Sequence, residues 1–437
     1  MKKVKVSNLN DLKSNKLLDE IIWLLMFIMS AIHGLMRISP GILSSCVTQI
    51  KTEFELSDEK FSMFGTINGF GCLIGSLIFT LVIEKISHKK LICFMLLLNC
   101  ISHFAFYFKL SFYNLLISRF ISGFASVFCF IYFPMWVDKF AIKNWTNFMQ
   151  TTVQMCNTIG HILGYFIYLI LGSKNWKYGF LIEIFTISSF TIIMILIPSK
   201  YYDKKPENKE YKEIYYYEEN EEESVIKDII CNLPYILITL YRGNRLFVFV
   251  AIDYWFSDYL QNALKEINPS IIFWSYSVTI VISNIFGNIL GGIIINQIGG
   301  TKSKNSFAAM AFLQFIAVLF GILSPLPNNV FDFSMLMSLY MFLNSASGII
   351  SISASFAVMP QNLTGTATGI YSIIVNLIAF LPAPYLYAFI KSFFQDGSNI
   401  IIVLMIYAFF GALELIIADV YMRVKKIKIH KEIEQKW

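Results

Sequence analysis

The stretch LVIEKISHKKLI, residues Leu81 to Ile92, places a cluster of charges between two long apolar runs. Five acidic or basic side chains fall within seven positions: Glu84, Lys85, His88, Lys89 and Lys90. An apolar run over residues 61–83 precedes the cluster, and another over residues 90–108 follows it. Each run is long enough to cross the hydrocarbon core of a bilayer as a helix. The cluster is therefore predicted to be a short polar turn between two membrane-spanning helices.

The composition of the whole chain points to a membrane protein. Of its 437 residues, 56% are hydrophobic and only 15% are charged, whereas ordinary soluble domains carry roughly 25% charged residues. The net charge of +6 is spread over short loops without a basic patch or arm, so no nucleic-acid partner is expected. The seven cysteines are scattered and form no CxxC pair, which favours small core-filling side chains over a metal or redox site.

Apolar segments of membrane-spanning length recur along the chain. They predict an all-α polytopic membrane protein with twelve transmembrane helices in two six-helix halves. Spanning strands are excluded because the runs are continuous rather than alternating. The predicted spans are Ile21–Cys46, Phe61–Ile83, Lys90–Phe108, Leu110–Val137, Met149–Gly172, Tyr178–Ile197, Tyr235–Leu260, Ile271–Ile295, Asn305–Leu323, Phe331–Val358, Gly365–Ile390 and Asn399–Met422.

A polar segment separates the two sets of spans. It reads PSKYYDKKPENKEYKEIYYYEENEEES and holds too few apolar residues to form a core. We therefore expect an N-terminal segment (1–20), a first six-helix half (21–198), a linker (199–230), a second six-helix half (231–422) and a tail (423–437).

The lysines and arginines predict the orientation. If the N-terminus is cytoplasmic, most of them fall in cytoplasmic segments, among them the leading lysines, Lys85, Lys89 and the tail. An excess of positive charge marks the cytoplasmic side of membrane proteins. Both termini and the linker are therefore expected on that side, in either the plasma membrane or an endolysosomal or vacuolar membrane.

The charged turn resembles the cytoplasmic loop motif of the major facilitator superfamily, a Gly, an Asp-Arg pair, and a Gly followed by basic residues. Glu84-Lys85 stands at the Asp-Arg pair, Ser87 at the second Gly, and His88-Lys89 at the basic pair. The stretch GGIIINQIGGTK, with Asn296 and Gln297, occupies the equivalent place in the second half. The resemblance implies substrate binding between the halves near the bilayer midplane. It also implies that Glu84, Lys85, Lys89 and Asn296 control the conformational change.

Several stretches resemble the spinster branch, whose members export lysolipids and sphingolipid phosphates. They are APYLYAFI (Ala383–Ile390), YWFSDYL (Tyr254–Leu260) and RFISGFASVFCFIYFPMWVDKF (Arg119–Phe140). Met36 and Ser126 stand where that branch has two acids that would serve proton coupling, so coupling and facilitated diffusion both stay open. The segment QMCNTIG (Gln154–Gly160) instead resembles the sugar porters, so a facilitator of a hexose or other small polar solute is the alternative.

Ionisable side chains inside a bilayer usually face a cavity or a partner. The predicted substrate-binding residues on the spans that would line such a cavity are His33, Arg37, Arg119, Ser126, Arg242, Arg245, Asp253, Trp255 and Ser351. Four arginines against one central acid favour an anionic solute, because guanidinium groups pair with phosphate and carboxylate oxygens. His103 and His161 are interpreted as packed polar side chains. No role is assigned to Glu183 or Glu414.

The expected function is secondary transport of a small amphipathic or anionic solute, with a lysophospholipid or sphingoid phosphate favoured. A membrane enzyme is disfavoured because the sequence has no HExxH, GxSxG or metal-spaced cluster, and no P-loop for a primary pump. A sensor that keeps a transporter fold is a third class. The expected partners are the solute and the lipid bilayer. No cofactor is expected, and the chain is expected to be a monomer.

The orientation is testable by cysteine labelling. Ser199→Cys and Asp332→Cys should react with a membrane-impermeant thiol reagent from opposite sides, because three predicted spans and the polar segment separate them in the chain. Labelling of both positions from one side would contradict the twelve-helix prediction.

Overall fold

The structure is a computed structural model. It describes residues 9–82, 86–140, 142, 145–172, 174–202, 229–265, 268–298, 305–358, 364–394 and 397–424. The first set of helices is α1 (Leu9–Leu35), α2 (Ile38–Ser45), α3 (Val47–Glu53), α4 (Asp58–Val82), α5 (His88–Tyr107), α6 (Phe112–Phe140), α7 (Thr146–Leu171) and α8 (Lys177–Leu196), followed by the short η1 (Ser199–Tyr201). The second set is α10 (Leu233–Asn262), α11 (Pro269–Tyr276), η3 (Ser277–Ile282), α12 (Ser283–Gln297), α13 (Asn305–Leu323), α14 (Val330–Ala357), α15 (Thr364–Val375), η5 (Asn376–Phe380), α16 (Ala383–Phe393) and α17 (Gly397–Val424).

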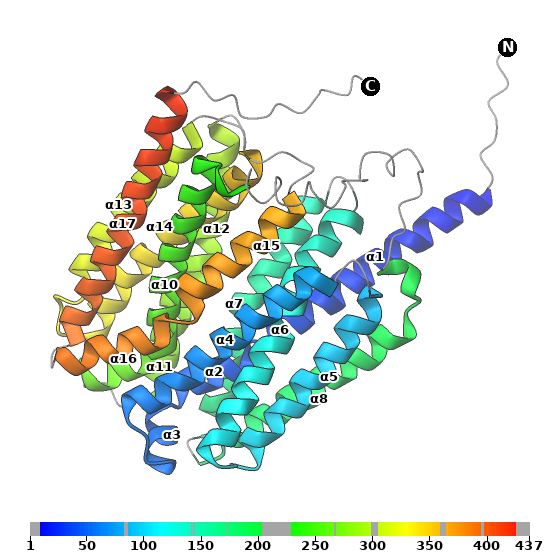
Figure 1. Cartoon of the computed structure of the whole chain (residues 1–437). Helices are drawn as coiled ribbons and strands as arrows, with labels where there is room; N and C mark the ends of the chain where they lie inside the picture. Colours follow the sequence, from blue (N-terminus) through cyan, green and yellow to red (C-terminus); the bar gives the residue numbers. More distant parts are fainter. Residues whose placement is uncertain are drawn as a thin grey trace.

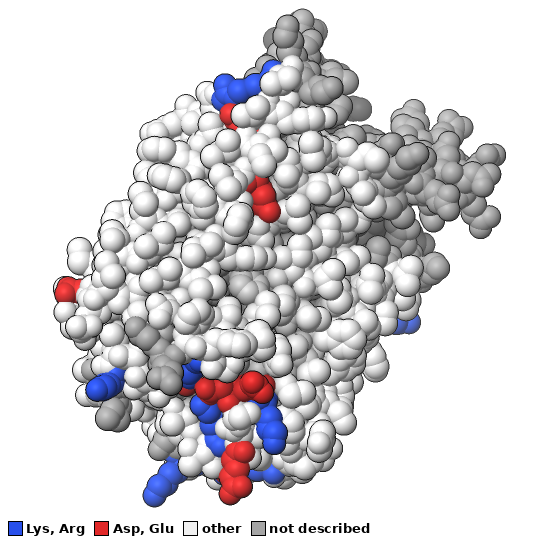
Figure 2. Space-filling view, turned by 60° about the vertical axis from the view of Figure 1, so that its left-hand side comes forward, with Lys and Arg blue, Asp and Glu red and all other residues white. Residues whose placement is uncertain are grey.

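The prediction of twelve membrane-spanning helices is confirmed. The described residues hold 11 helical spans of sufficient length and apolarity, and the apolar part of α7, Met155–Leu171, makes the twelfth. Most predicted and observed bounds differ by a few residues, and Asn305–Leu323 is the same in both. The exception is α1, which begins at Leu9 rather than at the predicted Ile21. Most of the face in Figure 2 is free of charged side chains, which gather towards the lower end of the view. This is the charge distribution expected of a protein that lies in a bilayer.

The helices pack in two groups. Helices α1 to α8 contact mainly one another, and so do α10 to α17. The start of α1 and the end of α17 lie towards the top of Figure 1, and we call this the terminal end. The short α3 and the last turns of α16 lie at the opposite end, the far end. Most of the predicted linker, residues 203–228, falls outside the described residues.

Three spans are interrupted within the bilayer. The first span breaks at Met36 and Arg37, between α1 and α2. Two others contain π-helical turns, η3 and η5, and Pro382 and Pro384 follow η5 at the start of α16. Proline cannot donate a backbone hydrogen bond, and π-turns inside helices often mark functional positions. The interruptions therefore indicate where these spans can bend.

Glycines bring neighbouring helices into close contact. A Cβ on Gly160 of α7 would lie 1.9 Å from the carbonyl oxygen of Gly34 in α1. The same kind of contact appears at the equivalent place of each group. Gly71 and Gly75 of α4 pack on α6, and Gly287 and Gly291 of α12 pack on α14. Small residues four apart let membrane helices approach closely. The repeated spacing supports two related six-helix units.

A substitution that adds one methyl group tests the contact between α1 and α7. Gly160→Ala should destabilise the protein by about 1–3 kcal/mol, because the added Cβ would meet backbone atoms that have no room to move. Gly292→Ala is the matched control, since nothing lies within 4 Å of its added Cβ. Thermal unfolding in detergent should show a lower midpoint for the first variant only. Equal midpoints would mean that α1 and α7 do not pack this closely.

Candidate functional site

Arg37 lies at the break between α1 and α2. Its Nε donates to Oδ1 of Asn157 on α7 at 2.5 Å. Its guanidinium carbon lies 4.4 Å from the ring centroid of Phe130 on α6. The ring of His33, one turn earlier, lies 4.8 Å from the same Phe130 ring. The structure therefore brings the predicted residues His33 and Arg37 together against one aromatic side chain.

Arg119 on α6 is buried against α4. Its Nε donates to the carbonyl oxygen of Phe64 at 3.4 Å, and its own carbonyl accepts from Asn68 Nδ2 at 3.1 Å. The side chain is 2% exposed, and its Nη1 is buried without a hydrogen-bond partner. Part of Arg119 thus holds two helices together, and one nitrogen remains available for an acceptor.

Arg242 and Arg245 lie one turn apart on α10. Arg242 Nη1 donates to Ser355 Oγ at 3.3 Å, and its guanidinium stacks on Tyr371 at 3.8 Å from the ring centroid. Arg245 Nη1 donates to the carbonyl oxygen of Asn344 at 3.4 Å, while its Nε is buried without a partner. Arg245 also lies against Gly348 of α14, where a Cβ would come within 2.7 Å of its guanidinium carbon.

None of these four arginines has a carboxylate of another described residue at ion-pair distance. The arginine ion pair found among the described residues is Arg423 with Asp419, at the end of α17. The four contact amides, hydroxyls, carbonyl oxygens and aromatic rings instead. Such partners bind a guanidinium group but do not neutralise it. The described interior therefore carries positive charge that an anion would offset.

Asp253 of α10 lies at the boundary between the two helix groups. Its Oδ1 accepts from the hydroxyl of Tyr276 on α11 at 2.6 Å. Its Oδ2 lies 3.5 Å from Nδ1 of His161 on α7. Tyr165, one turn after His161, stacks on Tyr276 with ring centroids 3.8 Å apart. Asp253 thus contacts the first group through a histidine and is held in the second group by a tyrosine.

A second histidine and carboxylate meet inside the first group. His103 Nε2 of α5 lies 3.4 Å from Oε1 of Glu183 on α8. Ser39 of α2 contacts the same oxygen at 3.4 Å, while Oε2 is buried without a partner. In the second group, Glu414 of α17 accepts a hydrogen bond from Asn244 Nδ2 of α10 at 2.9 Å. Sequence reasoning assigned no role to either glutamate, although an acid in an apolar run was itself a signal.

The remaining predicted substrate-binding residues contact their own surroundings. Trp255 is fully buried, donates from Nε1 to the carbonyl of Pro384 at 3.0 Å, and stacks on Tyr387. Ser126 Oγ donates to the Gly123 carbonyl at 3.1 Å, and Ser351 Oγ donates to the Gly348 carbonyl at 2.6 Å. In this conformation the structure does not bring these three side chains to the arginines.

The predicted gating residues are described only in part. Glu84 and Lys85 lie outside the described residues. Lys89 Nζ donates to the carbonyl oxygens of Ile195 and Ile197 at 2.7 and 2.6 Å, at the end of α8. A cation at a helix C-terminus satisfies its last carbonyls. Asn296 is exposed near the end of α12.

Four charged side chains join the helix groups at the far end. We call Lys51, Asp58, Asp258 and Lys391 the far-end cluster. Lys391 Nζ lies 2.5 Å from Asp258 in its own group and 3.0 Å from Asp58 in the other. Lys51 pairs with Asp58 in its own group and lies 3.9 Å from Asp258 in the other. Each lysine therefore contacts one acid of each group.

The far end has further polar contacts. Glu53 of α3 accepts from Trp176 Nε1 at 2.9 Å and also from Lys109. Burial raises the pKa of Glu53, but the hydrogen bonds from Lys109 and Trp176 and the nearby lysine charges outweigh it, so the net shift is downward. This carboxylate therefore stays ionised at neutral pH and keeps α3 attached to the first group.

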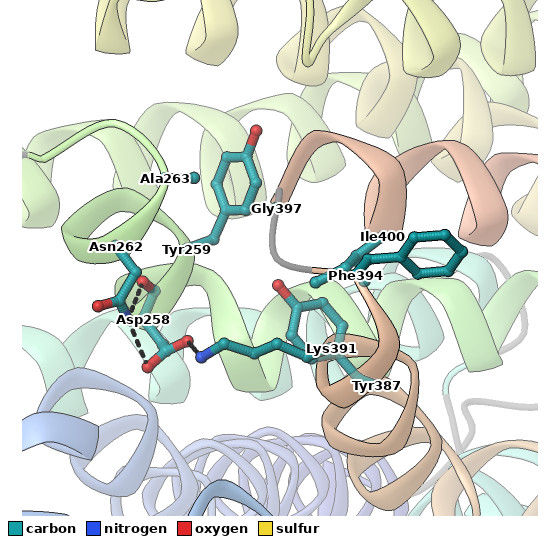
Figure 3. Close-up of a pocket in the computed structure, with 9 residues that line it drawn as sticks. All are labelled: Asp258, Tyr259, Asn262, Ala263, Tyr387, Lys391, Phe394, Gly397 and Ile400. Atoms are coloured by element: carbon teal, nitrogen blue, oxygen red, sulfur yellow. Dashed lines mark hydrogen bonds and ion pairs between the residues drawn. The ribbon is translucent and has the colours of Figure 1, made fainter.

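Two pockets open at the far end. The first, of about 390 Å³, lies beside Asp258 and Lys391 and is lined by Tyr259, Tyr387 and Phe394 (Figure 3). The second, of about 290 Å³, lies between the groups. Its lining includes Gln49 and Tyr165, whose Oε1 and hydroxyl are buried without partners. No cluster of three metal-ligating side chains occurs in the described part of the chain.

Solved structures share this fold. A bacterial homologue of the human lysosomal transporter spinster, in an inward-facing and occupied conformation, matches with a TM-score of 0.69 and 12% identity, covering 94% of this chain and 98% of that one. The D-xylose-proton symporter matches with a TM-score of 0.69 and 16% identity, covering 95% and 99%. No curated protein matches the chain in sequence at a significant level.

The sequence profile of the Major Facilitator Superfamily matches residues 22–384. This range covers the first ten spans, from residue 22 onwards, and the eleventh up to the start of α16. It agrees with the twelve observed spans and with the fold of the solved transporters. This chain belongs to the major facilitator superfamily.

Proposed function

We propose that the protein is a secondary transporter for an amphipathic anion, such as a lysophospholipid or a sphingoid phosphate, and works by alternating access. One observation carries the proposal. Arg37, Arg119, Arg242 and Arg245 have no carboxylate partner among the described residues. Burying a cation without a counter-ion is costly, so such a set is explained best by an anion that arrives as the substrate.

Arg37 is the first candidate for the anionic group. Phe130 and Asn157 fix its guanidinium at the break between α1 and α2. The planar guanidinium has five N–H donors and forms paired bonds with phosphate oxygens. Arg119 interacts electrostatically with Arg37 and keeps an unpartnered Nη1. The aromatic rings of Phe130 and Phe133 beside His33 offer apolar surface for the start of an acyl chain.

The contacts between the groups support an alternating mechanism. At the far end the far-end cluster joins the groups, and Tyr254 of α10 donates to the carbonyl of Phe61 on α4 at 3.0 Å. Ser257 donates to the carbonyl of Ser45 at 3.4 Å. This conformation is therefore closed at the far end. We infer that the terminal end faces the cytoplasm and that opening the far end requires these contacts to break.

A small polar solute is the second candidate. It is favoured by the pocket between the groups, where the Oε1 of Gln49 and the hydroxyl of Tyr165 lack partners. Amides and tyrosines without charge suit the hydroxyl groups of a sugar. The likeness to the D-xylose-proton symporter agrees with this alternative. Binding experiments on Arg37 separate the two candidates, because a neutral sugar has no anionic group for the guanidinium to pair with.

Substitution of Arg37 tests the anion proposal. Arg37→Ala should weaken binding of lysophosphatidic acid by about 1.5–3 kcal/mol, the cost of losing a hydrogen bond to a charged group. Binding of monoacylglycerol, which lacks the phosphate, should hardly change. Isothermal titration calorimetry in detergent measures both. Arg423→Ala is the control, because this arginine pairs with Asp419 at the surface. If a hexose competes for the site and Arg37→Ala leaves hexose uptake unchanged, the anion proposal is wrong. Binding without flux into proteoliposomes would indicate a sensor.

The far-end cluster is testable as a gate. Asp58→Asn removes the acid that both lysines contact from the first group. The side chains are about a quarter exposed (23% and 28% for Lys51 and Asp58). Solvent therefore weakens the pair, and we expect a cost of about 1 kcal/mol, roughly a fivefold shift towards the far-end-open state.

A cysteine pair reports this shift. Thr48 and Gln261 form a hydrogen bond across the far end. Thr48→Cys with Gln261→Cys should form a disulfide more slowly when Asp58→Asn is added, in a background with the exposed Cys231 replaced by serine. Asp419→Asn at the terminal end is the control. Equal cross-linking rates in all three proteins would show that the cluster does not hold the far end closed.

A further inference from the structure

The described interior contains two histidine–carboxylate pairs that differ in one respect. His103 and Glu183 both belong to the first group, on α5 and α8. His161 and Asp253 belong to different groups, on α7 and α10. The helices of one group pack tightly together and keep their contacts when the groups move as units. Only the second pair is therefore made and broken as the far end closes and opens.

We propose that His161 and Asp253 form a proton-binding site shared by the two helix groups, which links proton binding to closure of the far end. The proposal deepens the transport function proposed above and rests on it. Met36 and Ser126 stand where the resembled branch has two acids that would serve proton coupling. The pair of His161 and Asp253 supplies a titratable site instead. It takes a proton from water and returns it to water, so no other reactant is needed.

The geometry assigns a different role to each side chain. Tyr276 donates to Asp253 Oδ1 at 2.6 Å from within the second group, so this bond survives separation of the groups. Oδ2 is left for His161 Nδ1, at 3.5 Å. Tyr165 stacks on Tyr276 and aligns α7 with α11. Asp253 is thus held in place, and the imidazole approaches or leaves with the first group.

The proton balance follows from this arrangement. In the closed state a neutral imidazole beside a carboxylate binds one proton, and the product is an imidazolium–carboxylate pair without net charge. Both side chains are at most 13% exposed there, and an unpaired buried carboxylate is costly. When the groups separate, the imidazolium loses its carboxylate and releases the proton to water. Proton binding therefore favours the closed far end, and acidification should increase the closed fraction.

The neighbouring charges connect this site to the solute. The titratable groups that face the pair are Tyr276, Tyr165, Arg37 and Arg119. Burial and the two arginines disfavour an imidazolium at His161, whereas Asp253 favours it. An anion bound at Arg37 would offset the repulsion by the arginines, so the anion and the proton should each favour binding of the other. Such coupling is reciprocal. A neutral solute at the same place would leave the proton unaffected.

The test compares the two pairs. His161→Gln and Asp253→Asn remove the shared site, and His103→Gln and Glu183→Gln are the matched controls inside one group. The readout is cross-linking of the cysteine pair at 48 and 261 in purified protein, between about pH 5 and pH 8, where histidine changes charge. Because thiolate reactivity also changes with pH, a cysteine-directed bis-maleimide is used, and rates are divided by those of unfolded protein at each pH.

In the parent protein the closed fraction should fall as pH rises, by at most about tenfold in the closed-to-open ratio per pH unit for one linked proton. The dependence should vanish in either His161→Gln or Asp253→Asn and remain in both controls. A dependence that survives in both site variants, or that disappears equally in the controls, overturns the proposal. Gel filtration selects folded protein. If only one of the two site variants folds, that variant alone tests the proposal.

A second arm separates this proposal from the proposed function. Lysophosphatidic acid should steepen or shift the pH dependence in the parent protein, whereas monoacylglycerol should not. If the pH dependence requires His161 and Asp253 but the anion has no effect, the proton site stands and the anion substrate fails. If the anion binds through Arg37 while closure is independent of pH, the substrate stands and the proton site fails.

Discussion

A hydrocarbon layer solvates neither an unpaired peptide group nor an ion, and this constraint governs every level of the structure. It forces each crossing segment to satisfy its own backbone, so every described span is helical. It moves most charges to the ends of the spans, as the charge-poor face in Figure 2 illustrates. The few ions that remain inside must find partners within the protein. Among the described residues the four interior arginines make their direct contacts with neutral groups, which is the basis for proposing an anionic solute.

The spans could be predicted from sequence because their signal is local. A run of apolar residues long enough to cross the bilayer identifies a helix whatever its neighbours are. The bounds of α13 illustrate this, since the apolar run Asn305–Leu323 is also the observed helix. The resemblance of the loops to a known superfamily then supplied the order of the helices. His33 and Arg37, four apart in the sequence, likewise both contact the ring of Phe130 although the span breaks between α1 and α2.

The contacts between the groups could not be predicted in the same way. Lys51, Asp58, Asp258 and Lys391 each look like an ordinary charge at the end of a span, and their sequence separation hides that they meet. His161 and Asp253 were interpreted separately for the same reason. Their pairing depends on how the two six-helix groups face each other, and no local sequence pattern encodes the relative orientation of the groups. Pro382 and Pro384 were a sequence signal that this span is interrupted, but they did not indicate the contact that α16 makes with α4 of the other group.

The two sets of contacts between the groups differ in charge balance, and this difference gives them different tasks. The far-end cluster has two lysines and two aspartates, so its charges balance without any bound ion. It therefore joins the groups without needing an added charge. The interior pair lies beside unneutralised arginines, so its charge state depends on what else is bound. An anion near Arg37 changes the potential at His161 directly, and no long chain of coupled residues is required between them. In the proposed mechanism an anion bound at Arg37 thus alters the stability of contacts between the groups, which is the physical requirement for alternating access.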